Sequence, residues 1–455
     1  MLQTYNLSNF YIPESFINTH FREKKPYPQI QILRYMGNKR GLLNWLMPIL
    51  EEQLGVGDTV LDLFAGTSSV GYALKKKNKI IANDIQEYST VISKALLEFN
   101  ETIEENDFII NLHPEYKKNF IALLEIYGSA LEDERNVLKN NNVSKYQQFS
   151  DRIPKYGHLS RNDRYHLNFY CKESFINERR RKPQGFPYML FCIYYPNTFF
   201  SLEQCIEVDS LRYAIENVSK ASRKAVYLSC LMYAISKAVN SSGHFAEYLN
   251  HNSIESSHTI FEQRQDSVLK HFLIKLSEFK NLYIQEDWEN ESCNYDWKDA
   301  IKHLSKQNKL KDIKLIYIDP PYTSAQYSRF YHIPETLVKY DYPKLTLDKT
   351  TGKPVKGGYR NDRIQSSFSK ITAAEQAFSE IFATISKNTR STLAISYSDN
   401  SLVKPVDRLV DIASNYYQIV KKINGHSHSA QGSRFRHNGR GNHLVNEYVL
   451  ICKRK

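Results

Sequence analysis

Short apolar runs bounded by glycines, prolines or charged residues lie near both ends of the chain and predict buried strands. The first run, residues 59–64, is followed by a glycine turn, a helix-forming stretch to residue 74 and a second run at residues 79–83. This order of strand, turn, helix and strand predicts a βαβ unit with a parallel sheet. Further strands are predicted at residues 282–285, 315–318, 392–396 and 445–452, and a helix at residues 42–54.

The middle of the chain has a different pattern. Residues 101–280 are heavily charged and mostly helical or irregular, with the strongest helix expected at residues 222–239. The pattern therefore predicts an α/β fold in which one sheet is interrupted by a large, mostly helical insertion. A polar stretch at residues 344–370 predicts a long loop, and loops of this length in a compact domain are usually functional or disordered. The expected organisation is residues 1–100 as an N-terminal arm and the first half of the sheet domain, residues 101–280 as the insertion, and residues 281–455 as the second half.

Charge and composition narrow the classes of protein. The 455 residues include 61 Lys and Arg against 49 Asp and Glu, a net charge of +12 that suits a polyanionic partner. Aromatic residues make up 13% of the chain, too many for a disordered protein. No run approaches the ~20 apolar residues of a membrane span, and residues 1–10 lack the apolar centre of a signal peptide. Because the six cysteines form no CxxC pair, we expect reduced thiols and a cytoplasmic protein.

Residues 316–322, with the sequence IYIDPPY, are the most informative motif. An amine such as N6 of adenine is a poor nucleophile because its lone pair is delocalised into the ring. The Asp319 carboxylate and the Pro320 carbonyl can accept hydrogen bonds from that amine, and Pro321 stiffens the loop that holds them. The Tyr322 ring can stack on a flat base. The structural alternative is an ordinary proline turn with a helix-capping aspartate.

A second group of residues fits a nucleoside cofactor. In the sequence LDLFAG, Gly66 lets the backbone approach a ligand closely. Asp84 lies 18 residues later at the end of the second strand, where an acid can bind two ribose hydroxyls. The pattern is neither GxGxxG nor a P-loop, which argues against a dinucleotide or a triphosphate. Lys39 follows a Gly-Asn turn and can hold a carboxylate. The alternatives are an ordinary βαβ unit with an incidental acid, and a solvated lysine.

Two basic segments are candidates for contacts to nucleic acid, with solvated loops as the alternative. One lies in the insertion, and the other mixes basic and aromatic residues with glycine near the C-terminus. Four nearby histidines, at positions 426, 428, 437 and 443, fit no zinc spacing, so we expect no metal. The basic residues are Arg179, Arg180, Arg181 and Lys182 in the first segment and Arg434, Arg436 and Arg440 in the second.

The motifs also occur in a recognisable order: YMGNK, LDLFAG, NDIQE and IDPPY. This order resembles the Dam-type (class α, D12) DNA adenine-N6 methyltransferases, in which the cofactor motifs precede the target-recognition region and DPPY follows it. The resemblance covers residues 34–90 and 282–330 well and extends weakly to residues 393–397 and 447–450. It implies a Rossmann-like class I methyltransferase sheet with helices on both faces and a target-recognition domain in the insertion. The insertion itself aligns with no Dam recognition domain, so no target sequence is carried over.

The resemblance implies roles for single residues. The cofactor is expected to be S-adenosylmethionine, with Lys39 near its methionine carboxylate, Asp84 at its ribose and Asp287 near its adenine ring. Asp319, Pro320, Pro321 and Tyr322 are expected to be catalytic. The full expected cofactor set is Tyr35, Lys39, Asp62, Phe64, Gly66, Asp84, Ile85 and Asp287.

We therefore expect a site-specific methyltransferase that acts on N6 of an adenine flipped out of double-stranded DNA. The expected setting is restriction–modification or phage defence, with a cognate restriction or defence component as a further partner. Two alternatives stay open: an RNA adenine-N6 methyltransferase, and a catalytically silent nucleic-acid-binding protein of the same fold. The presence of both Gly66 and Asp319 argues against the silent protein. Cytosine-N4 enzymes usually carry serine in place of Asp319, which argues against that substrate.

Overall fold

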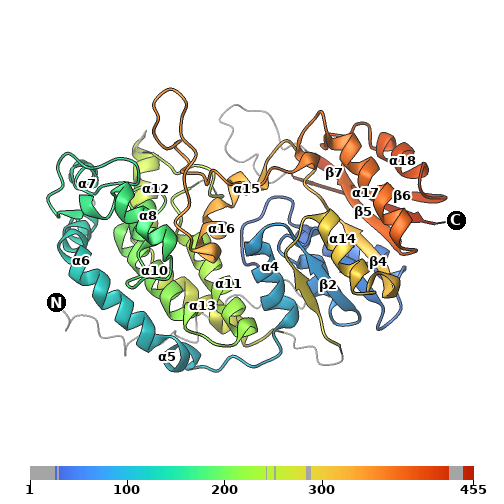
Figure 1. The fold of residues 1–455 in the computed structure, drawn as a ribbon, viewed down its shortest axis with the longest axis horizontal. Coiled ribbons are helices and arrows are strands. Elements are labelled where there is room, and N and C mark those ends of the chain that lie inside the picture. Colours follow the sequence, from blue (N-terminus) through green and yellow to red (C-terminus); the bar gives the residue numbers. More distant parts are fainter. Residues whose placement is uncertain are drawn as a thin grey trace.

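The computed structural model describes residues 26–27, 30–140, 142–241, 243–250, 253–282, 288–429 and 444–454. Within these residues, seven strands form one sheet, which occupies one half of the molecule, while helices fill the other half (Figure 1). The strand order is β3-β2-β1-β4-β5-β7-β6. The strands are β1 Thr59–Asp62, β2 Lys79–Asn83, β3 Glu291–Cys293, β4 Ile313–Ile318, β5 Thr392–Ser398, β6 Ile419–Ser429 and β7 Leu444–Lys453.

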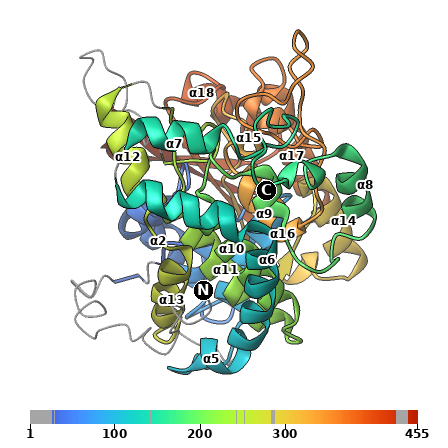
Figure 2. The ribbon, with the colours of Figure 1, turned by 90° about the vertical axis from the view of Figure 1, so that its left-hand side faces the viewer.

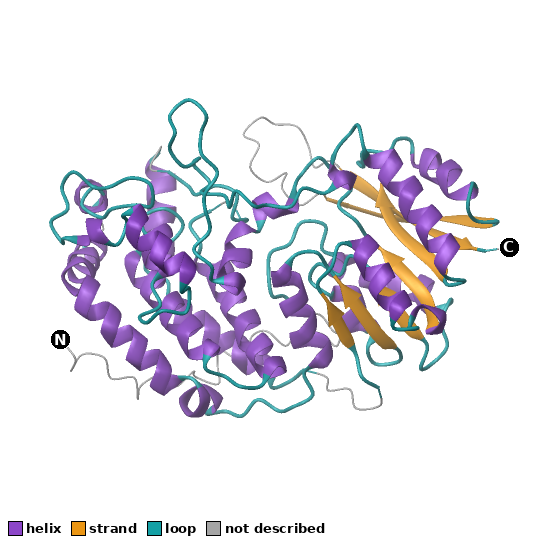
Figure 3. Cartoon of the chain, viewed as in Figure 1, coloured by secondary structure: helices purple, strands orange, loops and turns teal. Residues whose placement is uncertain are grey.

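The first five strands in this order run parallel, and β7 lies antiparallel between β5 and β6. Their apolar character follows from burial on both faces, since successive side chains point to opposite sides of the sheet. Val60 and Leu315 pack on one face, while Leu61 and Ile316 pack on the other. Helices cover both faces (Figure 3). The sheet is therefore fully covered, as the α/β prediction requires.

The helices divide between the two faces of the sheet and the helical half. The helices α2, α3 and α4 pack on the first face, and α14, α17 and α18 pack on the second. The helices are η3 Lys39–Leu42, α2 Leu43–Glu51, α3 Ser69–Leu74, α4 Glu87–Ser93, η4 Lys94–Glu98, α5 Asp107–Asn111, α6 His113–Lys139, α7 Val143–Ser150, η5 Leu167–Phe169, α8 Glu173–Arg181, α9 Leu190–Tyr194, α10 Leu202–Glu216, α11 Ala221–Ala238, α12 Ile254–Arg264, α13 Val268–Phe279, α14 Trp297–Lys306, η6 Leu310–Asp312, α15 Tyr327–Phe330, α16 His332–Lys339, η7 Ser367–Ser369, α17 Ala374–Asn388 and α18 Val406–Ser414.

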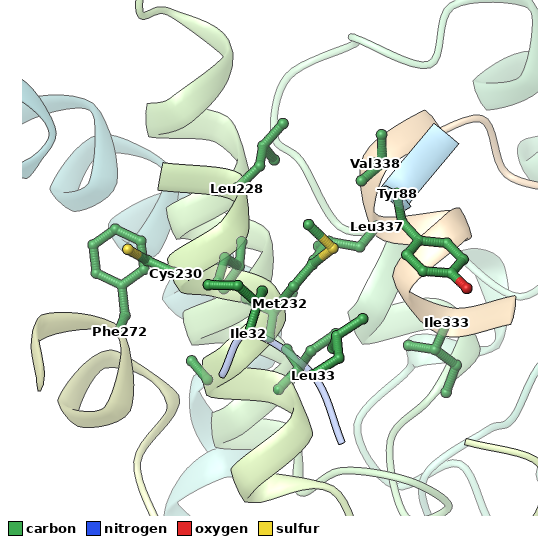
Figure 4. Packing of buried hydrophobic residues seen from close by; sticks show 14 of the residues in the cluster. Ile32, Leu33, Tyr88, Leu228, Cys230, Met232, Phe272, Ile333, Leu337 and Val338 are labelled. Atoms are coloured by element: carbon green, nitrogen blue, oxygen red, sulfur yellow. The ribbon is translucent and has the colours of Figure 1, made fainter. Parts of the chain in front are cut away.

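One hydrophobic core joins the helical half to the first face of the sheet. In the helical half, α6 packs against α10 and α11 packs against α13 (Figure 2). The core then continues from Phe272 of α13 through Met232 of α11 to Tyr88 of α4 and Leu337 of α16 (Figure 4). Because α4 and α16 lie next to the sheet, the two halves share buried side chains and are not separated by a polar seam.

Buried carboxylates from other helices cap several helix N-termini. Glu134 accepts hydrogen bonds from the first two backbone N–H groups of α10, at 2.9 and 3.0 Å. Glu207 does the same for α13 and Glu335 for α4, and Asp209 accepts from the second and third N–H groups of α9. A helix N-terminus has unpaired N–H groups and a partial positive charge, so a carboxylate satisfies both. Burial nevertheless raises the pKa of Glu134 to about 7 and that of Glu207 to about 8.

Most of the predicted elements are present, with two corrections. The helix expected at residues 222–239 is α11, and five of the six predicted strands correspond to β1, β2, β4, β5 and β7. The strand predicted at residues 282–285 is wrong at its start, since Leu282 is in no strand, and residues 283–285 lie outside the described residues. The strand that pairs with β2 is β3, which begins nine residues later, at residue 291, and pairs Ile81 with Glu291. The strand β6 was not predicted, because its sequence, IVKKINGHSHS, contains no continuous apolar run.

Three further findings concern membrane spans, metal sites and cysteines. In the described part of the chain, no helix is both long enough and apolar enough to cross a membrane. The same residues contain no group of three or more His, Cys, Asp or Glu side chains arranged to hold a metal ion. All six cysteines are free and buried. The histidines at positions 437 and 443 lie outside the described residues.

The shared core gives a stability prediction. Phe272 is fully buried between α13 and α11, so Phe272→Ala is expected to lower the free energy of unfolding by about 3–5 kcal/mol. Ile110 on α5 is 62% exposed and provides the control, because Ile110→Ala should change stability by less than about 0.5 kcal/mol. Denaturant unfolding followed by circular dichroism measures both. Equal midpoints for the two variants would contradict a core that extends to α13.

Candidate active site

A cavity of about 220 Å³ opens where the parallel strands β1, β2 and β4 end. Ligands of open α/β sheets bind at the carboxyl ends of the strands, because the loops there diverge and leave a crevice. Segments far apart in the sequence meet around this cavity. The main segments are residues 35–39, 62–67, 83–86, 295–297, 317–322 and 364–368.

A buried ionic cluster forms one wall of the cavity. The Lys39 ammonium lies 3.2 Å from Asp319 Oδ1 and 3.3 Å from Glu447 Oε2. The Tyr322 hydroxyl donates to Glu447 Oε1 at 3.1 Å and accepts from Lys39 Nζ at 3.4 Å. Lys39 is 4% exposed and Glu447 is 1% exposed. Lys39 of η3 and Glu447 of β7 therefore hold the acid and the aromatic ring of the DPPY sequence in place.

The charges in the cluster do not balance. Burial lowers the pKa of Lys39, but Asp319, Tyr322 and Glu447 outweigh burial and hold that pKa well above its usual value. Burial raises the pKa of Asp319 to about 6, although Lys39 opposes the shift. Asp62 lies at the end of β1 with an unpaired buried Oδ1 among the described residues, and burial together with Asp319 and Asp84 raises its pKa to about 8. The cavity is thus rich in carboxylates and short of cations.

A second corner of the cavity is built on Gly66 and Asp84. Asp84 Oδ2 accepts from the Gly66 N–H at 2.9 Å, and Asp84 Oδ1 accepts from the Gln86 N–H at 2.8 Å. Gly66 has a φ of +52°, and a Cβ there would lie 3.1 Å from the ring of Tyr35. A glycine is therefore needed both for its backbone conformation and for space. Burial raises the pKa of Asp84 to about 6.

Two tyrosines that follow the DPPY sequence hold the segment that precedes Lys39. The Tyr331 hydroxyl accepts from the Met36 N–H at 2.7 Å and donates to the Arg34 carbonyl at 3.2 Å. The Tyr327 hydroxyl donates to the Met36 carbonyl at 3.0 Å. The Tyr35 ring stacks on the Tyr331 ring, with centroids 4.8 Å apart. The position of this segment therefore depends on α15 and α16.

The floor of the cavity is tied together by Asn83. Its side chain donates to the carbonyls of Leu63 and Tyr295 at 3.2 and 3.1 Å and accepts from the Tyr295 N–H at 3.2 Å. This buried amide links the turn after β1 to the segment after β3. Trp297 lines the same side of the cavity and begins α14.

Comparison with known protein families identifies the fold. The family model of the D12 class N6 adenine-specific DNA methyltransferases matches residues 35–393. The chain belongs to this class. The matched range includes the cavity walls from Tyr35 to the start of β5, and it confirms the family and the fold that the order of the motifs indicated.

Curated relatives include three methylases. The chain is 27% identical over 393 residues to modification methylase LlaI of Lactococcus lactis subsp. lactis, covering 84% of this chain and 49% of that protein. It is 24% identical over 319 residues to type II methyltransferase M.FokI of Planomicrobium okeanokoites, covering 69% and 38%. Modification methylase StsI of Streptococcus sanguinis is also 24% identical over 319 residues, covering 69% and 37%. The chain thus spans half or less of the length of these relatives.

The structure brings most of the expected site residues together. The residues that line the cavity are Tyr35, Lys39, Asp62, Phe64, Gly66, Asp84, Ile85, Asp319, Pro320, Pro321 and Tyr322. Asp287 lies outside the described residues. In the segment after β3, the residues that line the cavity are Tyr295, Asp296 and Trp297.

Of the residues expected to contact DNA, some are engaged within the protein, and others are exposed or lie outside the described residues. Arg180 donates to the Tyr342 carbonyl at 2.7 Å and to Glu173, and Arg179 donates to the Gly185 carbonyl. These two guanidinium groups are thus engaged within the protein, whereas Arg181 and Lys182 are exposed. Arg434, Arg436 and Arg440 lie outside the described residues.

Sequence reasoning missed Glu447 as a site residue. A signal was available, because Val445, Glu447 and Val449 alternate along a predicted strand and therefore share one face. An acid on the buried face of a strand needs a partner, and Lys39 is that partner. The tyrosine clamp of Tyr327 and Tyr331 carried no such signal, since it depends on tertiary contacts with residues about 290 positions away.

The clustered acids give a pH prediction. An acid with a higher pKa in the folded protein binds more protons when folded, so the free energy of unfolding falls as pH rises between the two pKa values. For Asp62 that window runs from the ordinary value of 3.8 to about 8. Asp62→Asn is therefore expected to flatten the fall in stability of the ligand-free protein, by up to about 1.4 kcal/mol per pH unit. Thermal unfolding between pH 5 and pH 8 measures this slope.

The control for this prediction is Asp312→Asn, which removes an exposed carboxylate at the other end of β4. It should leave the pH dependence of stability unchanged. If Asp62→Asn gave the same slope as this control, the buried acid would not carry the predicted charge cost.

Proposed function

We propose that the chain is a site-specific methyltransferase that transfers a methyl group from S-adenosylmethionine to N6 of an adenine flipped out of double-stranded DNA. The observation that carries the proposal is the placement of Asp319. Its carboxylate ends β4, lines the cavity and is held by Lys39, while Pro320 and Tyr322 line the same wall. Family membership supports the reaction class.

The residues of the cavity fit S-adenosylmethionine. This cofactor carries a cationic sulfonium and an ammonium group, and the cavity offers the carboxylates of Asp62 and Asp319, both raised in pKa by burial. Bound cations would relieve this cost, because opposite charge favours the ionised acids. Asp84 would bind the ribose hydroxyls, and Lys39 would lie near the methionine carboxylate. When bound, the cofactor supplies an electrophilic methyl group.

The DPPY residues would prepare the amine. Asp319 and Pro320 would accept hydrogen bonds from the N6 amine and draw its lone pair out of conjugation with the ring, so that it can attack the methyl carbon in line. The carbon–sulfur bond would break, S-adenosylhomocysteine would leave, and N6 would lose one proton. The Tyr322 ring stacks on the base, and its hydroxyl, bound to Glu447, keeps the ring in one orientation. At neutral pH a carboxylate with a pKa of about 6 is mostly ionised, so that both of its oxygens can accept hydrogen bonds. No covalent enzyme intermediate is needed.

The helical half, residues 101–280, would provide target recognition. Its exposed Arg181 and Lys182 are candidates for phosphate contacts, as are the basic residues near the C-terminus. Two modification methylases and one type II methyltransferase among the relatives support a restriction–modification or phage-defence setting, with a cognate restriction or defence component as partner. The alternative substrate, an adenine in RNA, is tested by competition between duplex DNA and structured RNA for methyl transfer.

The first test replaces the catalytic acid. Asp319→Asn keeps the size of the side chain but removes one strong acceptor, so kcat for methylation of duplex DNA should fall by about 10²–10³-fold or more. DNA affinity without cofactor should be unchanged. Transfer of labelled methyl groups and fluorescence anisotropy measure the two quantities. Asp312→Asn, at the other end of β4, should retain full activity, and a fully active Asp319→Asn variant would refute the assigned role.

The second test concerns the cofactor. Asp84→Ala removes a charged acceptor, so the dissociation constant for S-adenosylmethionine should rise by about 10–100-fold in calorimetric titration. Circular dichroism of the ligand-free variant controls for misfolding, because Asp84 also accepts from the Gly66 N–H. An unchanged dissociation constant in a folded variant would remove Asp84 from the cofactor site.

A further inference from the structure

A long β-hairpin-like loop, residues 344–360, follows α16 and is here called the 344–360 hairpin. Bridges pair Leu345 with Arg360 and Leu347 with Pro354. In Figure 1 this segment, in orange, projects above α15 and α16. The residues at its tip, 347–353, are all exposed. The polar loop predicted at residues 344–370 therefore contains an ordered projection.

The tip of the hairpin is ordered by its own hydrogen bonds. The Asp348 N–H donates to the Lys353 carbonyl at 2.8 Å, and the Gly352 N–H donates to the Asp348 carbonyl at 2.9 Å. The Asp348 carboxylate accepts from the backbone N–H groups of Thr350 and Thr351 and from the Thr351 hydroxyl. These bonds lower the pKa of Asp348. The single acid of the tip is thus occupied in closing the turn.

The base of the hairpin is anchored in the body of the protein. Arg360 is 2% exposed and pairs with both oxygens of Asp341 at 2.7 Å, and it also binds Asp362. On one side of the hairpin, Pro354 packs so closely on Gly157 that a Cβ at Gly157 would lie 2.6 Å away. A projection with a fixed base presents its tip in a defined position, which lowers the entropy cost of binding.

The exposed part of the hairpin is basic. Residues 344–356 contain four lysines, at positions 344, 349, 353 and 356, against the single acid Asp348. Lys356 lies 3.8 Å from Glu247, whereas Lys349 and Lys353 at the tip have no ion-pair partner among the described residues. Free lysines on an ordered tip suit a partner with regularly spaced negative charge, such as the phosphates of a duplex.

The base of the hairpin continues along the chain into a wall of the cavity. Residues 364–368, which follow Arg360 closely in the sequence, form a wall of the cavity. Ser366 is fixed there by a reciprocal pair with Gln326, whose side chain accepts from the Ser366 N–H at 2.9 Å and donates to its carbonyl at 3.3 Å. Gln326 itself lies four residues after Tyr322. A duplex extends far beyond the one base that enters the cavity, so its flanking phosphates are candidates for contacts with the hairpin.

We propose that the 344–360 hairpin is a DNA-contacting element in which Lys349 and Lys353 bind phosphates of the duplex next to the flipped base. This inference rests on the proposed function, because it takes double-stranded DNA as the partner. It adds a DNA-contacting surface outside residues 101–280, in a segment that follows the DPPY sequence along the chain.

The test compares DNA binding by Lys349→Ala/Lys353→Ala with that of the unchanged protein, by fluorescence anisotropy over a range of salt concentrations. The double variant should bind more weakly, and the slope of log affinity against log salt concentration should lose about 2 units in magnitude, since each phosphate contact contributes about 0.9. The loss should be similar for different DNA sequences, and kcat at saturating DNA should be unchanged.

Two variants serve as controls. Lys302→Ala/Lys306→Ala removes the same charge from exposed positions on α14, which covers the other face of the sheet, and should keep the original slope. Lys349→Arg/Lys353→Arg keeps the charge and should restore binding. A salt slope for the alanine variant equal to that of the α14 control would overturn the inference, as would a loss confined to one DNA sequence. Failure of the unchanged protein to methylate DNA would instead refute the proposed function, because binding is measured without methyl transfer.

Discussion

The site depends on one buried ammonium group. Lys39 lies between the carboxylates of Asp319 and Glu447, at 3.2 and 3.3 Å, and is almost inaccessible to solvent. A buried lysine without partners would lose its charge or destabilise the fold, so η3, β4 and β7 must meet at this point. The cluster keeps one more negative than positive charge, and Asp84, with a pKa of about 6, adds to the excess, whereas Asp62, with a pKa of about 8, is mostly protonated at neutral pH until a cation binds. A cavity with this charge is prepared for a cationic ligand before any ligand arrives.

The helical half and the sheet are joined by a common hydrophobic core and by a carboxylate of one part that caps a helix of the other. Leu337 and Ile333 of α16 pack in the core that reaches α11 and α13, while Glu335 of the same helix caps α4. The helix α16 begins shortly after the DPPY sequence, and the preceding Tyr327 and Tyr331 hold the segment before Lys39. The DPPY loop is therefore positioned from the helical half as well as from the sheet. A class member with a different insertion would need another way to hold these tyrosines.

The sequence allowed the sheet and most of the cavity to be predicted, for physical reasons. Parallel strands buried on both faces leave continuous apolar runs, and the ends of those runs place Asp62, Asp84 and Asp319 at one edge. The strand β6 left no such run because it lies at the edge of the sheet, and β3 is only three residues long. The cap formed by Glu335, the tyrosine clamp and the anchoring of Arg180 depend on contacts between distant segments. No local pattern encodes such contacts, which is why Arg180 looked like a free basic residue.

The position of Glu447 in the chain has a consequence for how the protein is made. During translation, Lys39 and the first two strands leave the ribosome long before β7 is synthesised, and the insertion separates them from Asp319. A nascent chain that stops before β7 has the lysine and one acid but lacks the second acid, which also orients Tyr322. Incomplete chains thus lack the full ionic cluster, which closes only once β7 has inserted between β5 and β6.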